Sequence, residues 1–213
     1  MLIEKELFNK WACKYENDIH ALKDVYPFAG YFDVIVHIRK TLLPMPTASV
    51  LDLGVGTGLM LSEIIKGNDY SFRGCDFSDE MVNYAQNRLN SDAIFEHDIR
   101  KAEAPDQITE TKFDCIYSAY TFHHFELPKK IEIIQTYLPF LKTTGHFLIA
   151  DISFENESEL QKVKSEVGDR WDADEEMGYW RRDEFMDALK KHNLKATYTK
   201  ISFCAGIYHI QPI

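Results

Sequence analysis

The residues best suited to chemistry form a glycine-rich stretch, Val50-Leu51-Asp52-Leu53-Gly54-Val55-Gly56-Thr57-Gly58. A short apolar run, predicted to be a buried strand, leads into three alternating glycines. Glycine is needed where the chain turns sharply and where a ligand must touch the backbone. The pattern favours a ligand-binding loop, although a plain strand-to-helix turn would also be compatible with it.

The spacing of this loop argues against a dinucleotide. In the G-x-G-x-x-G fingerprint of dinucleotide sites the pyrophosphate rests on a helix N-terminus, and here Leu59 stands at the third glycine position. Asp52 precedes the first glycine. A carboxylate there would repel a pyrophosphate but could orient an ammonium group. The loop therefore suits a nucleoside with a cationic amino-acid tail.

Further polar residues follow the later predicted strands. Asp76 lies roughly 20 residues beyond the loop, where an acid can bind both ribose hydroxyls, although it could also simply cap a helix. Asp98 follows the next strand. His123 and His124 follow the fourth, and histidine titrates near neutrality, which makes them the best base candidates. They could instead line the pocket without transferring a proton; if one meets substrate, His123 is slightly favoured.

These residues need elements that bring them together. The periodicity predicts one or two helices over 5–26, further helices over 31–43, 59–66, 79–89, 129–141 and 183–192, and strands over 49–53, 71–76, 93–96, 113–118, 145–151, 195–201 and 203–211. Alternating strands and helices predict a parallel sheet covered on both faces, with the strand carboxyl ends on one edge. A tight connection at Ser202 predicts that the last two strands are antiparallel.

The glycine loop resembles motif I of the class I S-adenosylmethionine-dependent methyltransferases, and every position matches. The stretch Gly74-Cys75-Asp76-Phe77-Ser78 resembles the second motif of that family. Trp11-Ala12-x-x-Tyr15 resembles the opening helix of small stand-alone bacterial members. Tyr15 would then approach the methionine part of the cofactor, or it could be plain packing.

The resemblance implies S-adenosyl-L-methionine as cofactor and a role for each matched residue. Gly54 and Gly56 would approach the methionine part, and Asp52 would hold its amino group directly or through water. Asp76 would bind the ribose, and Ser118 would contribute a backbone contact. The other implied contacts are Thr57 and Gly58 in the loop, Phe77 and Met81 flanking the adenine and ribose, Asp98 at the adenine amino group and Ile99 against its ring.

The implied fold is an α/β, Rossmann-like class I methyltransferase sheet. It would be mostly parallel, with an antiparallel strand near the C-terminus, flanking helices and a small helical cap. Residues 1–213 would form one domain, in which the N-terminal helices over 1–44 and an insertion over 154–182 cap the active site. Arg181 and Arg182 could bind a substrate carboxylate or pair with nearby acids.

The amino-acid composition limits which kinds of binding partner are expected. The 213 residues carry a net charge of −10, which disfavours nucleic acid and favours a small-molecule acceptor. No segment has the roughly 18 apolar residues of a membrane span, so no membrane partner is expected. Four dispersed cysteines predict reduced thiols and a cytoplasmic protein. The expected assembly is a monomer or homodimer.

The predicted function is in-line methyl transfer, which needs orientation of the reactants and no acid for the leaving group. Histidine, aspartate and glutamate do not cluster at ligand spacing along the chain, so no metal is predicted. Two alternatives remain: a non-catalytic protein that binds or senses the cofactor, and an NAD(P)-dependent reductase on a similar sheet.

Overall fold

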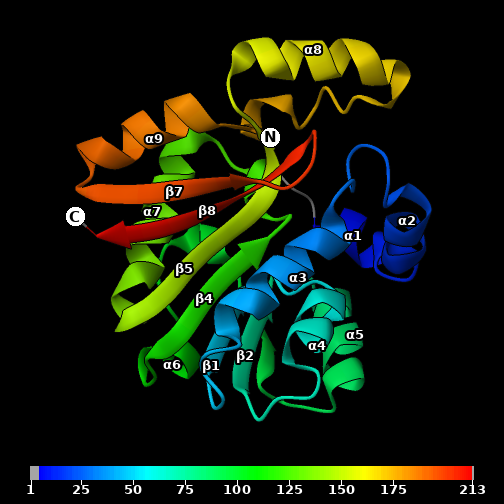
Figure 1. Cartoon of the computed structure of the whole chain (residues 1–213). Helices are drawn as coiled ribbons and strands as arrows, with labels where there is room; N and C mark the ends of the chain where they lie inside the picture. Colours follow the sequence, from blue (N-terminus) through cyan, green and yellow to red (C-terminus); the bar gives the residue numbers. More distant parts are fainter. Residues whose placement is uncertain (1–4, 213) are drawn as a thin grey trace.

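The computed structural model describes residues 5–212 and shows a single eight-stranded sheet with helices on both faces (Figure 1). Residues 1–4 and 213 of the predicted domain lie outside the described residues. The strands are β1 (Ser49–Leu53), β2 (Ser71–Asp76), β3 (Ile94–Glu96), β4 (Phe113–Ala119), β5 (Leu141–Phe154), β6 (Trp180–Arg181), β7 (Leu194–Lys200) and β8 (Ala205–Pro212). Their order is β3-β2-β1-β4-β5-β8-β7, and β6 pairs with β5.

The sheet is mostly parallel, as predicted. Strands β3, β2, β1, β4 and β5 run in one direction, so their carboxyl ends share one edge. Strand β8 runs antiparallel to both β5 and β7, with Phe147 opposite Ile210 at one end of its pairing with β5. This confirms the Rossmann-like sheet with an antiparallel strand near the C-terminus.

The helices divide between the two faces of the sheet. They are α1 (Lys5–Trp11), α2 (Tyr15–Leu22), α3 (Tyr31–Leu42), α4 (Leu59–Ile65), α5 (Asp79–Leu89), α6 (Asp106–Thr109), α7 (Leu127–Tyr137), α8 (Glu157–Val167) and α9 (Arg182–Lys191). Buried side chains of α3, α4 and α5 belong to one core cluster, and those of α6, α7 and α9 to another. No helix within residues 5–212 combines the length and apolar character that a bilayer crossing requires.

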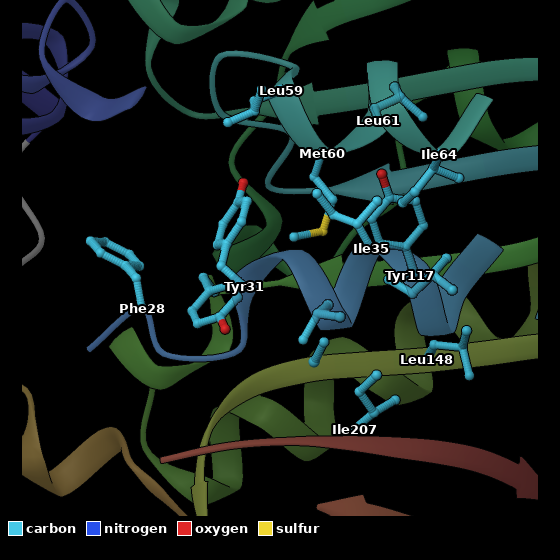
Figure 2. Close-up of a cluster of buried hydrophobic side chains, with 14 of the residues drawn as sticks. Phe28, Tyr31, Ile35, Leu59, Met60, Leu61, Ile64, Tyr117, Leu148 and Ile207 are labelled. Carbon is cyan, nitrogen blue, oxygen red and sulfur yellow. The ribbon is translucent and has the colours of Figure 1, made fainter. Parts of the chain in front are cut away.

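Alternation along the strands separates these two cores. In β1, Val50 belongs to the first cluster and Leu51 to the second, because successive strand residues point to opposite faces. Figure 2 shows the first cluster, where Ile35 of α3 and Met60 of α4 meet Tyr117 of β4. The central strands are therefore buried on both faces, and polar groups have room only at their ends.

Two boundaries differ from the predictions. The predicted helix over 129–141 ends at Tyr137, because Pro139 has no N–H to continue the helical hydrogen bonds, and a 3-10 turn follows. Strand β5 begins at Leu141 rather than at 145; its first residues are largely exposed, so burial gave no signal for them. The two-residue strand β6 and the four-residue helix α6 were too short for periodicity to indicate.

Of the N-terminal helices predicted as a cap, α1 and α2 lie at the carboxyl-end edge of the sheet, whereas α3 packs on one face of the sheet with α4. Figure 1 shows α1 and α2 beyond the strand ends and α8 leading away from the end of β5. The helical conformation is interrupted between Trp11 and Tyr15, so the predicted helical region 5–26 consists of two helices. Segment 154–182 contains α8, two 3-10 turns and β6.

The docking of α3 can be tested with two substitutions on that helix. Ile38→Ala should lower the free energy of unfolding by about 2–5 kcal/mol, since Ile38 is fully buried against the sheet. Val36→Ala should change it by no more than about 0.5 kcal/mol, because Val36 is 47% exposed. Urea denaturation of both variants measures the difference, and equal losses would contradict the orientation of α3.

Candidate active site

A cavity of about 620 Å³ opens at the carboxyl ends of the parallel strands. Its lining includes Trp11 and Tyr15 from the N-terminal helices α1 and α2, and Gly54 and Gly56 from the loop after β1. This volume is typical of a pocket that encloses a cofactor-sized ligand. Parallel sheets bind ligands at this edge, so the fold and the cavity agree on the location of the site.

The glycine loop forms one wall in a fixed conformation. The backbone N–H groups of Gly54 and Val55 both donate to the carbonyl of Cys75, at 2.9 Å each. Gly54 has φ +86°, and a Cβ there would come within 2.3 Å of Thr121 Oγ1. Only glycine fits, because the left-handed conformation and the close neighbour both exclude a side chain.

Asp76 joins the loop to the end of β2. Its carboxylate accepts hydrogen bonds from the N–H of Gly56 and from the N–H of Ser78, each 2.9 Å long. Burial raises the pKa of Asp76 to about 6, although these backbone donors act in the opposite direction. The carboxylate lies on the cavity wall with acceptor capacity remaining, since a carboxylate offers about four acceptor positions.

The next strand end brings Asp98 and Arg100 to the same wall. Arg100 Nε donates to Asp98 Oδ1 at 2.8 Å, and its guanidinium lies 5.0 Å from the centre of the Phe77 ring. Burial acts to raise the pKa of Asp98. The hydrogen bonds from Arg100 lower this pKa by more than burial raises it, so the net shift is downward. Asp98 is therefore an ionised acceptor beside an aromatic ring.

The predicted site residues separate into two groups. The cavity is lined by Tyr15, Gly54, Gly56, Asp76, Phe77, Met81, Asp98, Ile99, His123 and His124. Asp52, Thr57, Gly58 and Ser118 do not line it. Asp52 accepts a hydrogen bond from the Tyr117 hydroxyl, and Ser118 donates to the carbonyl of Leu53, so both support the loop from within the core.

The two histidines line the cavity, and each is paired with a carboxylate. His123 Nδ1 lies 2.6 Å from Asp151 Oδ1, and the backbone N–H of His123 donates to Asp151 Oδ2 at 2.9 Å. On the other side, His124 Nδ1 lies 2.8 Å from Glu175 Oε1. His123 Nε2 also lies 3.5 Å from Glu175 Oε2, so two acids and two imidazoles from three separate segments are grouped here.

Burial and charge act differently on the two imidazoles. Burial lowers the pKa of His123, but the Asp151 carboxylate more than compensates and the net shift is upward. Burial and the neighbouring His123 lower the pKa of His124, despite the opposing effect of Glu175. The two histidines could therefore transfer a proton or bind a ligand through their ring nitrogens.

One buried polar atom on the wall has no partner within the protein as described. The Tyr120 hydroxyl makes no hydrogen bond in residues 5–212, although its side chain is only 7% exposed. Its ring stacks on Tyr31, with centroids 5.1 Å apart. Tyr120 lines the cavity, so this unpaired hydroxyl is a buried polar group close to the ligand space.

Comparison with known proteins agrees with this geometry. A family model described as a methyltransferase domain matches residues 50–145. An uncharacterised methyltransferase of Anoxybacillus flavithermus is 28% identical over 162 residues, which cover 76% of this chain and 73% of the relative. These matches support a class I S-adenosylmethionine-dependent methyltransferase.

Solved structures show the same fold for this methyltransferase. A DhpI complex with SAM and HEP superimposes with a TM-score of 0.67 at 15% identity, covering 99% of this chain and 98% of DhpI. The plantazolicin methyltransferase BpumL gives 0.63 at 19% identity, covering 98% and 97%. The methyltransferase matches argue against the NAD(P)-dependent reductase that the sequence had left open.

Sequence reasoning did not assign roles to two residues of the methyltransferase cavity region. Asp151 follows β5 at the same sheet edge as Asp76, and that position alone was a signal. Glu175 lies in an irregular segment without periodicity, so nothing in the sequence linked it to the histidines. Arg181 and Arg182 instead pair with Glu157 and Glu155, as the ion-pair alternative expected.

A pair of glycine substitutions tests whether the loop receives the cofactor. Gly56 and Gly67 have φ +53° and +78°, and a Cβ would meet nothing within 4 Å at either position. Gly56→Ala and Gly67→Ala should each cost about 1–2 kcal/mol of stability for the left-handed conformation. Only Gly56→Ala should weaken S-adenosylhomocysteine binding, by about tenfold or more, because Gly56 lines the cavity.

Thermal unfolding and isothermal titration of both variants supply the comparison. Gly67 lies just beyond α4 and away from the cavity lining, which makes it the matched control. Equal affinities for the two variants would show that the cofactor does not contact the loop at Gly56.

Proposed function

We propose that this enzyme transfers the methyl group of S-adenosylmethionine to a small-molecule acceptor held beside His123 and His124. One observation carries the proposal: a single cavity extends from the Asp76 carboxylate to the histidine pair. The cofactor would occupy the glycine-loop end. Its sulfonium methyl would then point toward the histidines.

The cofactor position follows from the polar groups on the wall. Asp76 is placed to accept hydrogen bonds from the ribose hydroxyls, with Gly56 bringing the backbone close to the methionine part. Phe77, Met81 and Ile99 supply an apolar slot for the adenine, and Asp98 supplies an acceptor for its amino group. Asp52 would act through water or through the loop, because its side chain lies behind the cavity wall.

A small-molecule acceptor is consistent with the partly closed cavity and with the negative net charge of the protein. N-terminal aromatic side chains, among them Phe8 and Trp11, close one side of the cavity, and the protein carries a net charge of −10. Structural neighbours include a magnesium protoporphyrin IX methyltransferase and the plantazolicin enzyme, but also a small RNA methyltransferase. Fold alone does not choose between these acceptors; the acidic charge favours the small molecule, since phosphate backbones would be repelled.

The reaction needs little from the protein beyond alignment. The acceptor's lone pair forms the new bond to the methyl carbon, the sulfur–methyl bond breaks, and its electron pair stays on sulfur as a neutral thioether. Holding the reactants in line can supply roughly 7–11 kcal/mol. His123, whose Nδ1 is held by Asp151, turns its Nε2 toward Glu175 on the wall of the same cavity.

Asp76→Ala tests the ribose site. The substitution should weaken S-adenosylhomocysteine binding by about 1.5–3 kcal/mol, the usual loss for hydrogen bonds to a charged group. That corresponds to roughly 10- to 150-fold in the dissociation constant, measured by isothermal titration. Asp69→Ala, an exposed acid outside the cavity, is the control for the loss of charge. Unchanged affinity in folded Asp76→Ala would refute this placement of the ribose.

The same titration has an expected pH dependence. Only the ionised carboxylate accepts from both ribose hydroxyls, and burial raises the pKa of Asp76 to about 6. Affinity should therefore be full near pH 8 and fall as the pH drops through 6 toward 5. Asp76→Asn should lose this step. Any remaining slope near pH 7 would report Asp52, whose pKa burial raises to about 7.

His123→Ala tests the acceptor end. Turnover, measured as transfer of labelled methyl to a metabolite extract, should fall far more than cofactor affinity, because His123 is proposed to lie beside the acceptor and Asp76 beside the cofactor ribose. The exposed His192 offers a matched control as His192→Gln. If S-adenosylhomocysteine affinity falls in parallel with turnover, His123 belongs to the cofactor pocket.

A further inference from the structure

Three potential metal-ligand atoms converge at the acceptor end of the cavity. His123 Nε2 lies 3.5 Å from Glu175 Oε2, and His124 Nδ1 lies 2.8 Å from Glu175 Oε1. One atom from each of the three residues can be chosen so that all lie within 4.8 Å of one another. All three residues line the cavity. The sequence predicted no metal because its ligand residues are far apart along the chain; the fold removes that separation.

The hydrogen bonds fix which atom His123 offers. Asp151 is fully buried and accepts from the backbone N–H of His123, while its other oxygen faces Nδ1 at 2.6 Å. An ionised carboxylate only accepts, so Nδ1 donates and Nε2 is the atom that faces Glu175. In the neutral imidazole, Nε2 then carries the lone pair, and it lies 3.5 Å from a Glu175 oxygen, so a cation between the two atoms could bind both.

We propose that His123 Nε2, His124 Nδ1 and the Glu175 carboxylate bind a zinc ion whose fourth position opens into the acceptor end of the cavity. Two histidines and one glutamate with an open position form a known ligand set of catalytic zinc. Asp151 then acts as the carboxylate that orients a metal-bound histidine. Nitrogen ligands favour zinc over magnesium or calcium, which prefer oxygen.

The distances approach those around a bound ion, and the Glu175 carboxylate would turn so that one of its oxygens meets both histidines. Zinc bonds of about 2.0–2.2 Å in a tetrahedral arrangement separate neighbouring ligand atoms by roughly 3.4 Å. The 3.5 Å between His123 Nε2 and Glu175 Oε2 matches that separation. The 2.8 Å between His124 Nδ1 and Glu175 Oε1 would need to open by roughly half an ångström.

The segment that carries Glu175 is tied to the histidine turn by contacts outside the cluster. The buried Lys130 side chain of α7 donates to the carbonyl of Gly178, three residues beyond Glu175, and lies over the Trp180 ring. Gly178 itself packs so closely against the turn that a Cβ would clash with the carbonyl oxygen of His123. The ligand set is therefore held together before any ion binds, as a metal site requires.

The role of the ion rests on the proposed function. An acceptor oxygen, nitrogen or sulfur bound at the open position would lie where the methyl group arrives. Zinc would lower the pKa of that donor, whose proton leaves to solvent. The freed lone pair forms the bond to the methyl carbon, and the sulfur–methyl pair remains on sulfur. Zinc changes neither charge nor oxidation state, so the step balances without another reactant.

The test uses tag-free full-length protein, stripped with a chelator and titrated with zinc chloride and, separately, cobalt chloride. The wild-type protein should bind about one equivalent of zinc, and the cobalt form should show the visible bands of a four- or five-coordinate ion. His124→Ala and Glu175→Gln should abolish this binding, and Asp151→Asn should weaken it roughly 10- to 100-fold. His192→Gln should match the wild type.

S-adenosylhomocysteine titration of the same samples separates the two proposals. Intact cofactor binding without zinc binding by the wild-type protein would overturn the metal site and leave the methyl-transfer proposal standing. Zinc binding that survives in Glu175→Gln and His124→Ala would also overturn it, because the ion would then lie elsewhere. Absent cofactor binding in protein that still takes up zinc at this site would overturn the proposed function alone.

Discussion

Burial of the central strands on both faces is the constraint on which the rest of the structure depends. Strands β1, β4 and β5 have apolar side chains toward α3 and α4 on one face and toward α7 and α9 on the other. A polar group along these strands would lose its hydration without a partner. Chemistry is therefore confined to the strand ends, and parallel pairing gathers those ends at one edge.

Each acid at that edge is stabilised by donors that the fold supplies. Asp52 receives the Tyr117 hydroxyl, Asp76 receives two backbone N–H groups, and Asp151 receives His123. These bonds compensate the cost of burying a carboxylate. They also set different electrostatic conditions, since burial raises the pKa values of Asp52 and Asp76 but the His123 contact leaves that of Asp151 lowered. Along one sheet edge, the pKa values of Asp52 and Asp76 near the proposed cofactor site are thus raised, and that of Asp151 near the proposed acceptor site is lowered.

The polar residues at the acceptor end come from segments with little regular structure of their own. His123 and His124 lie in a 3-10 turn after β4, and Glu175 lies between α8 and β6. Such segments vary without disturbing the sheet, whereas the glycine loop and Asp76 are bonded to its framework. This division explains how one fold can keep its cofactor site and change its acceptor.

The sequence by itself determined the sheet, the glycine loop and the family, because these depend on local periodicity and on spacings within one strand-loop-helix unit. It placed Asp76 and Asp98 at strand ends, and the structure brings both to the cavity. Only the tertiary structure decided that Asp52 and Ser118 support the loop from behind the wall, because side-chain direction at a strand end depends on neighbouring strands. It alone brought Glu175 to His124 across 51 residues of chain, since irregular segments carry no pattern and their contacts arise only when the core has fixed their ends.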